Sequence, residues 1–93
     1  MHDFTYVGFE PSTELKSLGK QTFWQIEEKA PTFSCKKATM SRLPSNGYKG
    51  EFHVCTMSGE FIADAEGDAP EQVIEALNQK MRHLLIEWKK NLK

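Results

Sequence analysis

The sequence predicts an α+β fold in which four strands form one sheet and two helices pack on the same sheet face. Short runs with alternating apolar residues predict strands, whereas two longer runs with apolar residues every three or four positions predict helices. Clusters of Gly, Pro, Asn and Ser separate these runs. The predicted order is β-α-β-β-β-α. Two amphipathic helices and one sheet bury their apolar surfaces most economically when both helices share one face.

Length and composition indicate one small domain spanning residues 1–93. The formal net charge of −1 argues against a surface that is positive throughout, but it allows a local basic patch. No apolar run approaches the roughly 18 residues of a membrane span. Cys35 and Cys55 are too few for a disulfide scaffold, and the N-terminus lacks a signal-peptide pattern. We therefore expect reduced thiols in the cytoplasm.

Residues 4–10 predict the first strand because aromatic and β-branched residues dominate there. A helix is predicted over residues 13–29, with Ser12 as its N-cap. Gly19 lies within the apolar face of this helix and permits close contact with a neighbouring element. Trp24 lies almost opposite that face. The apolar face consists of Leu15, Leu18, Thr22 and Ile26, with Phe23 at its edge.

Three further strands are predicted over residues 33–43, 51–57 and 60–66. Residues 44–47, Pro-Ser-Asn-Gly, form a turn signal between the first two of them. Ser58 and Gly59 provide a two-residue hairpin connection before the last one. These three strands are therefore expected to form an antiparallel meander.

Alternation within the last two strands assigns their side chains to two sheet faces. Ala63 and Ala65 lie on the face that the helices cover, and their small size allows the final helix to approach the sheet closely. The opposite face is unusually apolar for a face left in water, so it is a candidate protein-interaction face, for example in a homodimer. Its members are His53, Cys55, Met57 and Ile62.

The final helix is predicted over residues 66–93. Asp68 can cap it, Pro70 stands in its first turn, and Glu71 completes a capping box. Its apolar stripe consists of Val73, Ile74, Leu77, Met81, Leu84, Leu85, Trp88 and Leu92. Its opposite face carries the cations Arg82, Lys89, Lys90 and Lys93.

Metal binding and catalysis find little support in the sequence. His53 and Cys55 point the same way from one strand, and Cys35 could join them, but a structural zinc site requires four ligands. We expect the cysteines to pack as small hydrophobic residues and predict no metal site. No glycine-rich phosphate loop, nucleophile elbow or zinc-protease motif is present. Hence no enzyme activity, cofactor or small-molecule substrate is predicted.

Residues 59–68, Gly-Glu-Phe-Ile-Ala-Asp-Ala-Glu-Gly-Asp, precede a long helix with a basic end. This arrangement resembles the ribosome hibernation promoting factors, also called ribosome-associated protein Y or sigma-54 modulation proteins. Residues 13–16 and Phe23, Ile26 and Glu27 also agree with the family's first helix. The resemblance covers nearly the whole chain and matches the short form of the family.

This resemblance implies a fold like that of double-stranded-RNA-binding domains. It also implies binding to the small ribosomal subunit near the decoding region, where such proteins block translation and store idle ribosomes under stress. Basic residues on both helices would contact rRNA phosphates.

Carried over by position, Lys16 matches a basic residue of the family's first helix. Lys80, Lys89 and Lys93 match lysines of its last helix. Two positions depart from the pattern: His83 stands where an arginine is expected, and Thr22 where a lysine is expected. Arg82 and Lys90 can compensate from neighbouring positions.

Lys and Arg side chains on helix faces neutralise RNA phosphates and release counterions, and such binding needs no deep pocket. Trp24 could stack on an unpaired base. The predicted rRNA-binding residues are Lys16, Lys20, Trp24, Lys80, Arg82, His83, Lys89, Lys90 and Lys93. Two alternatives stay open: a solvated helix end that complements the helix dipole, and a protein-interaction module without ribosome binding.

Overall fold

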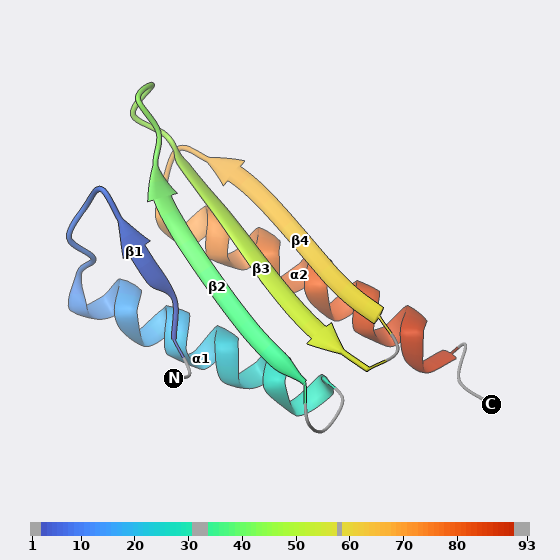
Figure 1. The fold of residues 1–93 in the computed structure, drawn as a ribbon. Helices are drawn as coiled ribbons and strands as arrows, with labels where there is room; N and C mark the ends of the chain where they lie inside the picture. The colour runs from blue at the N-terminus through green and yellow to red at the C-terminus, as the bar shows by residue number, and fades with distance from the viewer. Residues whose placement is uncertain (1–2, 31–33, 58, 91–93) are drawn as a thin grey trace.

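The structure, a computed structural model, describes residues 3–30, 34–57 and 59–90. The elements in chain order are β1 (Thr5–Val7), α1 (Thr13–Lys29), β2 (Cys35–Arg42), β3 (Tyr48–Thr56), β4 (Gly59–Gly67) and α2 (Pro70–Lys90). The strands form one sheet in the order β1-β2-β3-β4, and both helices cover the same face of it (Figure 1). The predicted fold class and element order are confirmed.

The sheet is mixed. β1 pairs with β2 in parallel, as the α1 crossover between them requires, and β2, β3 and β4 form an antiparallel meander. β2 and β4 therefore run in the same direction. Because each helix runs against these strands, α1 and α2 are roughly parallel and lie side by side (Figure 1).

The core lies between the two helices and the covered sheet face. Most residues of both predicted helix stripes are buried there, while Leu18, Leu84 and Trp88 are partly buried and Leu92 lies outside the described residues. Phe23 is only 1% exposed and its ring centroid lies 5.1 Å from that of Phe52, so it belongs to the centre of the core rather than to the edge. The buried apolar side chains are Phe4, Leu15, Phe23, Ile26, Ala38, Met40, Phe52, Val54, Ala63, Ala65, Val73, Ile74, Leu77, Met81 and Leu85.

Two glycines allow the layers to approach closely. A Cβ atom at Gly19 would lie 2.5 Å from Oη of Tyr6, which confirms the predicted close contact of α1 with a neighbouring element. A Cβ atom at Gly50 would lie 2.7 Å from side-chain atoms of both Val73 and Leu77. Gly50 was not predicted to have this role, although it allows α2 to rest on β3.

The ends of several strands differ from the prediction. β1 has three residues rather than seven because Gly8, at φ 84°, turns the chain away from the sheet. β3 begins at Tyr48 instead of at residue 51 and pairs there with Arg42. The predicted turn over residues 44–47 is confirmed, since Asn46 adopts a φ of 70° and the Leu43 N–H donates to the Gly47 carbonyl at 2.7 Å.

The second hairpin connection is one residue earlier than predicted. Thr56 pairs with Gly59, so residues 57 and 58 link β3 to β4. Met57 therefore lies beyond the strand to which it was assigned. Ser58 lies outside the described residues.

The helix starts confirm one predicted cap and correct the other. The Leu15 N–H donates to Ser12 Oγ at 3.1 Å, so Ser12 caps α1 as predicted. α2 begins at Pro70 rather than at residue 66 because β4 continues to Gly67, and the carbonyl of Ala69 accepts from the Val73 N–H at 3.3 Å. Asp68 thus lies one residue ahead of the capping position. Within the described residues, neither helix is long and apolar enough to cross a membrane.

Candidate nucleic-acid interface

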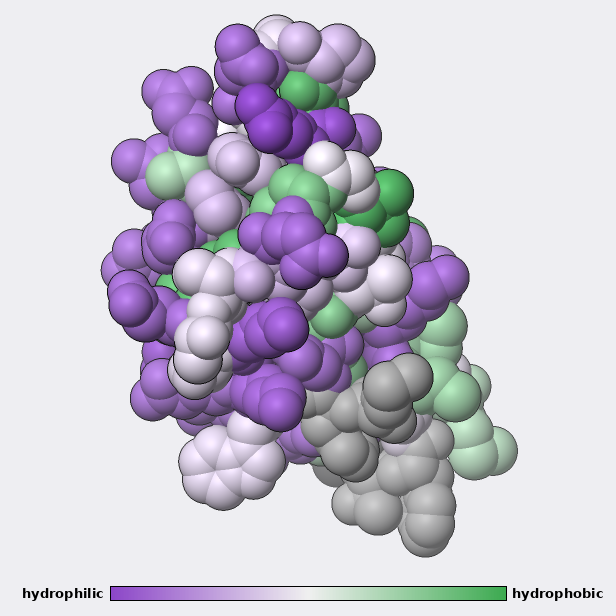
Figure 2. Space-filling view, turned by 90° about the vertical axis from the view of Figure 1, so that its left-hand side faces the viewer, coloured by the Kyte–Doolittle hydropathy of each residue, from purple (hydrophilic) through white to green (hydrophobic). Residues whose placement is uncertain are grey.

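On α1 the predicted RNA-binding residues form one exposed ridge. Lys16, Lys20 and Trp24 are spaced four residues apart, so they lie above one another on the helix surface, over about 12 Å. Trp24 is 60% exposed, in agreement with its predicted place opposite the core. Figure 2 views the molecule from the side on which β1 and the start of α1 lie in Figure 1, and hydrophilic residues predominate on that surface.

A hydrogen bond between the helices shows which sides face each other. Asn78 Nδ2 of α2 donates to Gln25 Oε1 of α1 at 3.2 Å. At about 100° per residue, Lys16 lies roughly 180° and Lys20 roughly 140° around α1 from Gln25. Lys16 and Lys20 are therefore on the side of α1 turned away from α2.

The cations of α2 fall on two sides of that helix. Arg82 and Lys89 lie within about 40° of Asn78 and thus border α1. Lys80 lies on the β4 side, where its ammonium donates to the Asp64 carbonyl at 2.6 Å. His83 lies on the β4 side as well, and lines a shallow hollow there with Lys80, Asp64, Ile62, Ala63 and Leu84.

Lys16 and Lys20 of α1 are also displaced along the helix axis from the cations of α2. Because the helices are parallel and Gln25 is level with Asn78, Lys16 and Lys20 are level with the start of α2. At 1.5 Å per residue, they lie roughly 10 to 30 Å along the axis from residues 80–90. The structure thus places Lys16 and Lys20 and the cations of α2 on a diagonal across the helix layer.

Charge on α2 changes sign along its length. Glu71 and Glu75 are exposed in the first half, whereas residues 80–90 contain four Lys or Arg residues and one carboxylate, that of Glu87. We call the group Lys80, Arg82, His83, Lys89 and Lys90 the basic half of α2; all of its members are exposed. Cations near a helix C-terminus complement the helix dipole, so this arrangement also favours the helix itself. Lys93, the remaining predicted residue, lies outside the described residues.

Lys29 is a cation that the sequence analysis did not select. It lies four residues after Gln25 and therefore on the side of α1 that faces α2, level with Arg82. It is half-buried. Whether Lys29 lies near the cations of α2 depends on which side of α1 faces α2. The hydrogen bond between Gln25 and Asn78 shows that side, and the sequence alone does not.

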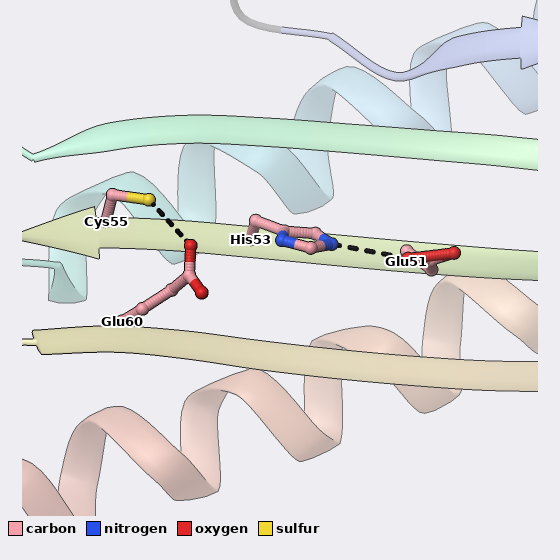
Figure 3. Close-up of polar contacts among 4 residues, drawn as sticks. All are labelled: Glu51, His53, Cys55 and Glu60. Carbon is pink, nitrogen blue, oxygen red and sulfur yellow. Dashed lines mark hydrogen bonds and ion pairs between the residues drawn. The ribbon is translucent and has the colours of Figure 1, made fainter.

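The open sheet face is more polar than predicted. His53 and Ile62 are directly paired on it, and Ile62 is 51% exposed. However, Figure 3 shows His53 directed toward Glu51, with Nε2 and Oε2 3.3 Å apart. Met57 is fully exposed in the connection after β3.

Cys55 also has a polar partner on this face. Its thiol donates to the Glu60 carboxylate at 3.0 Å (Figure 3). This hydrogen bond raises the pKa of the Cys55 thiol, and the negative charge of Glu60 raises it further. The expectation that the two cysteines pack as hydrophobic residues is therefore wrong, since both are exposed.

No protein-family model matches the sequence. No curated protein sequence matches it either.

Solved structures, in contrast, share the fold over its full length. One is a ribosomal subunit interface protein from Coxiella burnetii, with a TM-score of 0.71 and 16% sequence identity, covering 95% of this chain and 98% of that one. Another is the N-terminal domain of Protein Y from Thermus thermophilus, with a TM-score of 0.64 and 12% identity, covering 97% of this chain and 98% of that one. The chain therefore has the β-α-β-β-β-α fold of these two proteins.

Proposed function

We propose that the protein is a ribosome-associated factor that binds rRNA of the small subunit through its helix layer, inhibits translation and promotes ribosome hibernation under stress. The observation that carries this proposal is the full-length fold similarity to a ribosomal subunit interface protein and to Protein Y. The sequence resemblance in residues 59–68 and in the basic end of α2 points to the same class of protein.

The charge distribution suits an RNA backbone better than a small ligand. The basic half of α2 presents several cations with one carboxylate among them, and Lys29 adds a further cation beside Arg82. Such groups neutralise phosphates, and each one engaged makes binding more sensitive to salt. An RNA strand or helix that also reached Lys16 and Lys20 would cross the two helices diagonally. Trp24, at the end of the α1 ridge that contains Lys16 and Lys20, is exposed enough to stack on an unpaired base.

Sedimentation with purified ribosomal subunits tests this proposal. The full chain is expected to co-sediment with small subunits at low salt and to dissociate as the salt concentration rises, with weaker binding to large subunits. Added to a cell-free translation reaction, it should lower protein synthesis in proportion to the occupied small subunits. Failure to bind small subunits even at low salt would overturn the proposal.

Charge-reversal variants test whether small-subunit binding depends on the helix layer or on another part of the surface. The double variant Lys89→Glu and Lys90→Glu should lose most small-subunit binding because it places two negative charges in the basic half of α2. The matched control, Lys37→Glu and Lys49→Glu, makes the same change in net charge on the open sheet face and should bind nearly as wild type does. Equal losses in both variants would mean that net charge, rather than the helix layer, governs binding.

A second candidate function is that of a homodimerising interaction module without ribosome affinity. The specific observation in its favour is the exposure of Ile62 on the open sheet face and of Met57 in the connection after β3. On this alternative, analytical ultracentrifugation would detect a concentration-dependent dimer of the wild-type chain. Ile62→Lys would abolish that dimer.

A further inference from the structure

Cys35 and Cys55 lie directly opposite each other on neighbouring antiparallel strands. They form the first pair of the β2–β3 register, and both side chains are exposed on the open sheet face. They line a shallow hollow of about 530 Å³ on that face, together with residues that include Lys37, Glu51, His53 and Glu60. Both thiols are reduced in the structure. The sheet register therefore makes a facing dithiol from residues far apart in the sequence.

The spacing of such a pair permits a disulfide bond, but with strain. Directly opposite residues in an antiparallel pair have Cα atoms about 4.5 or 5.5 Å apart, within the range of about 4.4 to 6.8 Å found for disulfides. Their Cβ atoms lie about 4.5 to 5.5 Å apart, whereas a disulfide needs about 3.8 Å. The strands must draw together slightly to form the bond. A strained, exposed disulfide is reduced more easily than a structural one, which favours reversible formation.

We propose that Cys35 and Cys55 form a reversible intramolecular disulfide, so that the open sheet face is a thiol–disulfide site that responds to hydrogen peroxide. In the first step, the Cys35 thiolate attacks one peroxide oxygen, the O–O bond breaks, and Cys35 becomes a sulfenic acid as the leaving hydroxide takes up a proton to give water. In the second step, the Cys55 thiolate attacks the Cys35 sulfur and the S–O bond breaks, so that a second water leaves. Overall, two thiols and one hydrogen peroxide become one disulfide and two waters.

The polar contacts on this face distinguish the roles of the two thiols. Cys55 holds its proton because the thiol donates to the Glu60 carboxylate at 3.0 Å. Cys35 is therefore assigned the first attack and Cys55 the second, in which the disulfide closes. Two glutathione thiols would reverse the reaction by thiol–disulfide exchange and leave as one glutathione disulfide.

A metal ion is the rival occupant of a site with two cysteines and a histidine. Among residues 3–30, 34–57 and 59–90, no group of three or more His, Cys, Asp or Glu side chains is arranged to hold a metal. Figure 3 shows the reason, because His53 extends along β3 toward Glu51 and away from Cys55. The dithiol site also lies on the sheet face opposite the helices, so it does not depend on the proposed ribosome binding.

Peroxide treatment of the reduced full chain tests the proposal. The expected product is a monomer that has lost two hydrogens by intact mass, no longer reacts with iodoacetamide, and yields a peptide linking Cys35 to Cys55. Glutathione should restore both thiols. In Cys55→Ser the reaction should stop at a sulfenic acid on Cys35, which dimedone traps. Thiols that stay open to alkylation, or products that are only intermolecular dimers or sulfinic acids, would overturn the proposal.

A pair of variants on β4 tests the assigned order. Glu60→Gln removes the charged acceptor of the Cys55 proton, so disulfide closure at neutral pH should become severalfold faster. Glu66→Gln is the matched control, since it makes the same change on the same strand and face, about 20 Å away. If both variants close at the wild-type rate, Glu60 does not restrain Cys55 and the assigned order is wrong.

Discussion

At the residue scale, Tyr6 carries a buried polar atom that lacks a hydrogen-bond partner among the described residues. Its hydroxyl is buried over Gly19 and has no hydrogen-bond partner among the described residues. Burial, followed by the negative charge of Asp3, raises the pKa of Tyr6 to about 12. A buried hydroxyl without a partner costs desolvation free energy that no hydrogen bond returns.

Tyr6→Phe should therefore leave the free energy of unfolding at pH 7 unchanged or raise it by up to about 1 kcal/mol. The ring stays in contact with Phe4 and Phe9, since only the oxygen is removed. Urea denaturation followed by tryptophan fluorescence measures the difference. A loss of more than about 1 kcal/mol would reveal a hydrogen bond to the hydroxyl.

The raised pKa of Tyr6 also predicts a pH dependence. Its ordinary value is 10.0 and its value in the folded chain is about 12, so the unfolded chain gives up the proton first as the pH rises. The contribution of neutral Tyr6 to stability is complete below pH 10 and is lost as the pH rises toward 12. Denaturation at a series of pH values should show a shallower loss in Tyr6→Phe than in wild type. Tyr48→Phe, which keeps Tyr6, should retain the steeper loss.

Single residues were predicted from the sequence where a local rule applies to them. Ser12 as a helix cap and Gly19 as a site of close contact follow from local patterns, and both are confirmed. No local rule predicts the close contact of Gly50 with α2 or the hydrogen bond of Lys80 to the Asp64 carbonyl. Their roles depend on where α2 lies over β3 and β4, which is set by long-range packing.

At the element scale, the fit of α2 against β3 depends on Gly50. Gly50→Val should lower the free energy of unfolding by about 1 to 3 kcal/mol, because the new side chain would overlap Val73 and Leu77 and force them or the helix to shift. Urea denaturation measures this loss. Lys49→Val, one residue away on the open face, is the control and should change stability by about 0.5 kcal/mol or less. Equal effects in the two variants would mean that valine disturbs β3 itself.

A separate prediction concerns Lys29, which lies at the border between the end of α1 and the basic half of α2. Lys29→Gln should weaken binding to small-subunit rRNA and lower the slope of log affinity against log salt by roughly one. Fluorescence anisotropy with an rRNA fragment at several salt concentrations measures both quantities. Lys37→Gln, on the open sheet face, should leave the slope unchanged. An unchanged slope in Lys29→Gln would exclude Lys29 from the interface.

Elements with strong periodicity were predicted well, whereas strand ends were not. The bounds of α1 agree because Ser12 and the break before Pro31 mark both ends in the sequence. β3 extends back to Tyr48 because pairing with β2 continues through Gly50, although glycine has a low strand propensity. The start of β3 is thus set by cross-strand pairing rather than by local strand propensity.

At the scale of the whole molecule, the net charge of −1 conceals a separation of charge along the helix layer. The sequence identified nearly all of its cations but not their arrangement. A contact between Gln25 and Asn78, which are 53 positions apart in the sequence, shows which side of α1 faces α2 and which turns of the two helices are level. The diagonal arrangement of the cations, and the facing dithiol on the other side of the sheet, both arise from such long-range pairings.

The two faces of the sheet allow a decisive comparison between the proposed functions. Ile62→Lys adds a cation to the open face, at the edge of the hollow that Ile62 shares with Lys80 and His83, and Ile62 is exposed enough to accept it without loss of folding. If the helix layer binds the ribosome, this variant should co-sediment with small subunits as wild type does, while Lys89→Glu with Lys90→Glu should not. If the open face is the functional surface, the effects reverse: Ile62→Lys abolishes self-association, and the α2 variant keeps it. Sedimentation of both variants, with and without ribosomal subunits, separates these outcomes because Ile62 lies on β4, whereas Lys89 and Lys90 lie at the end of α2.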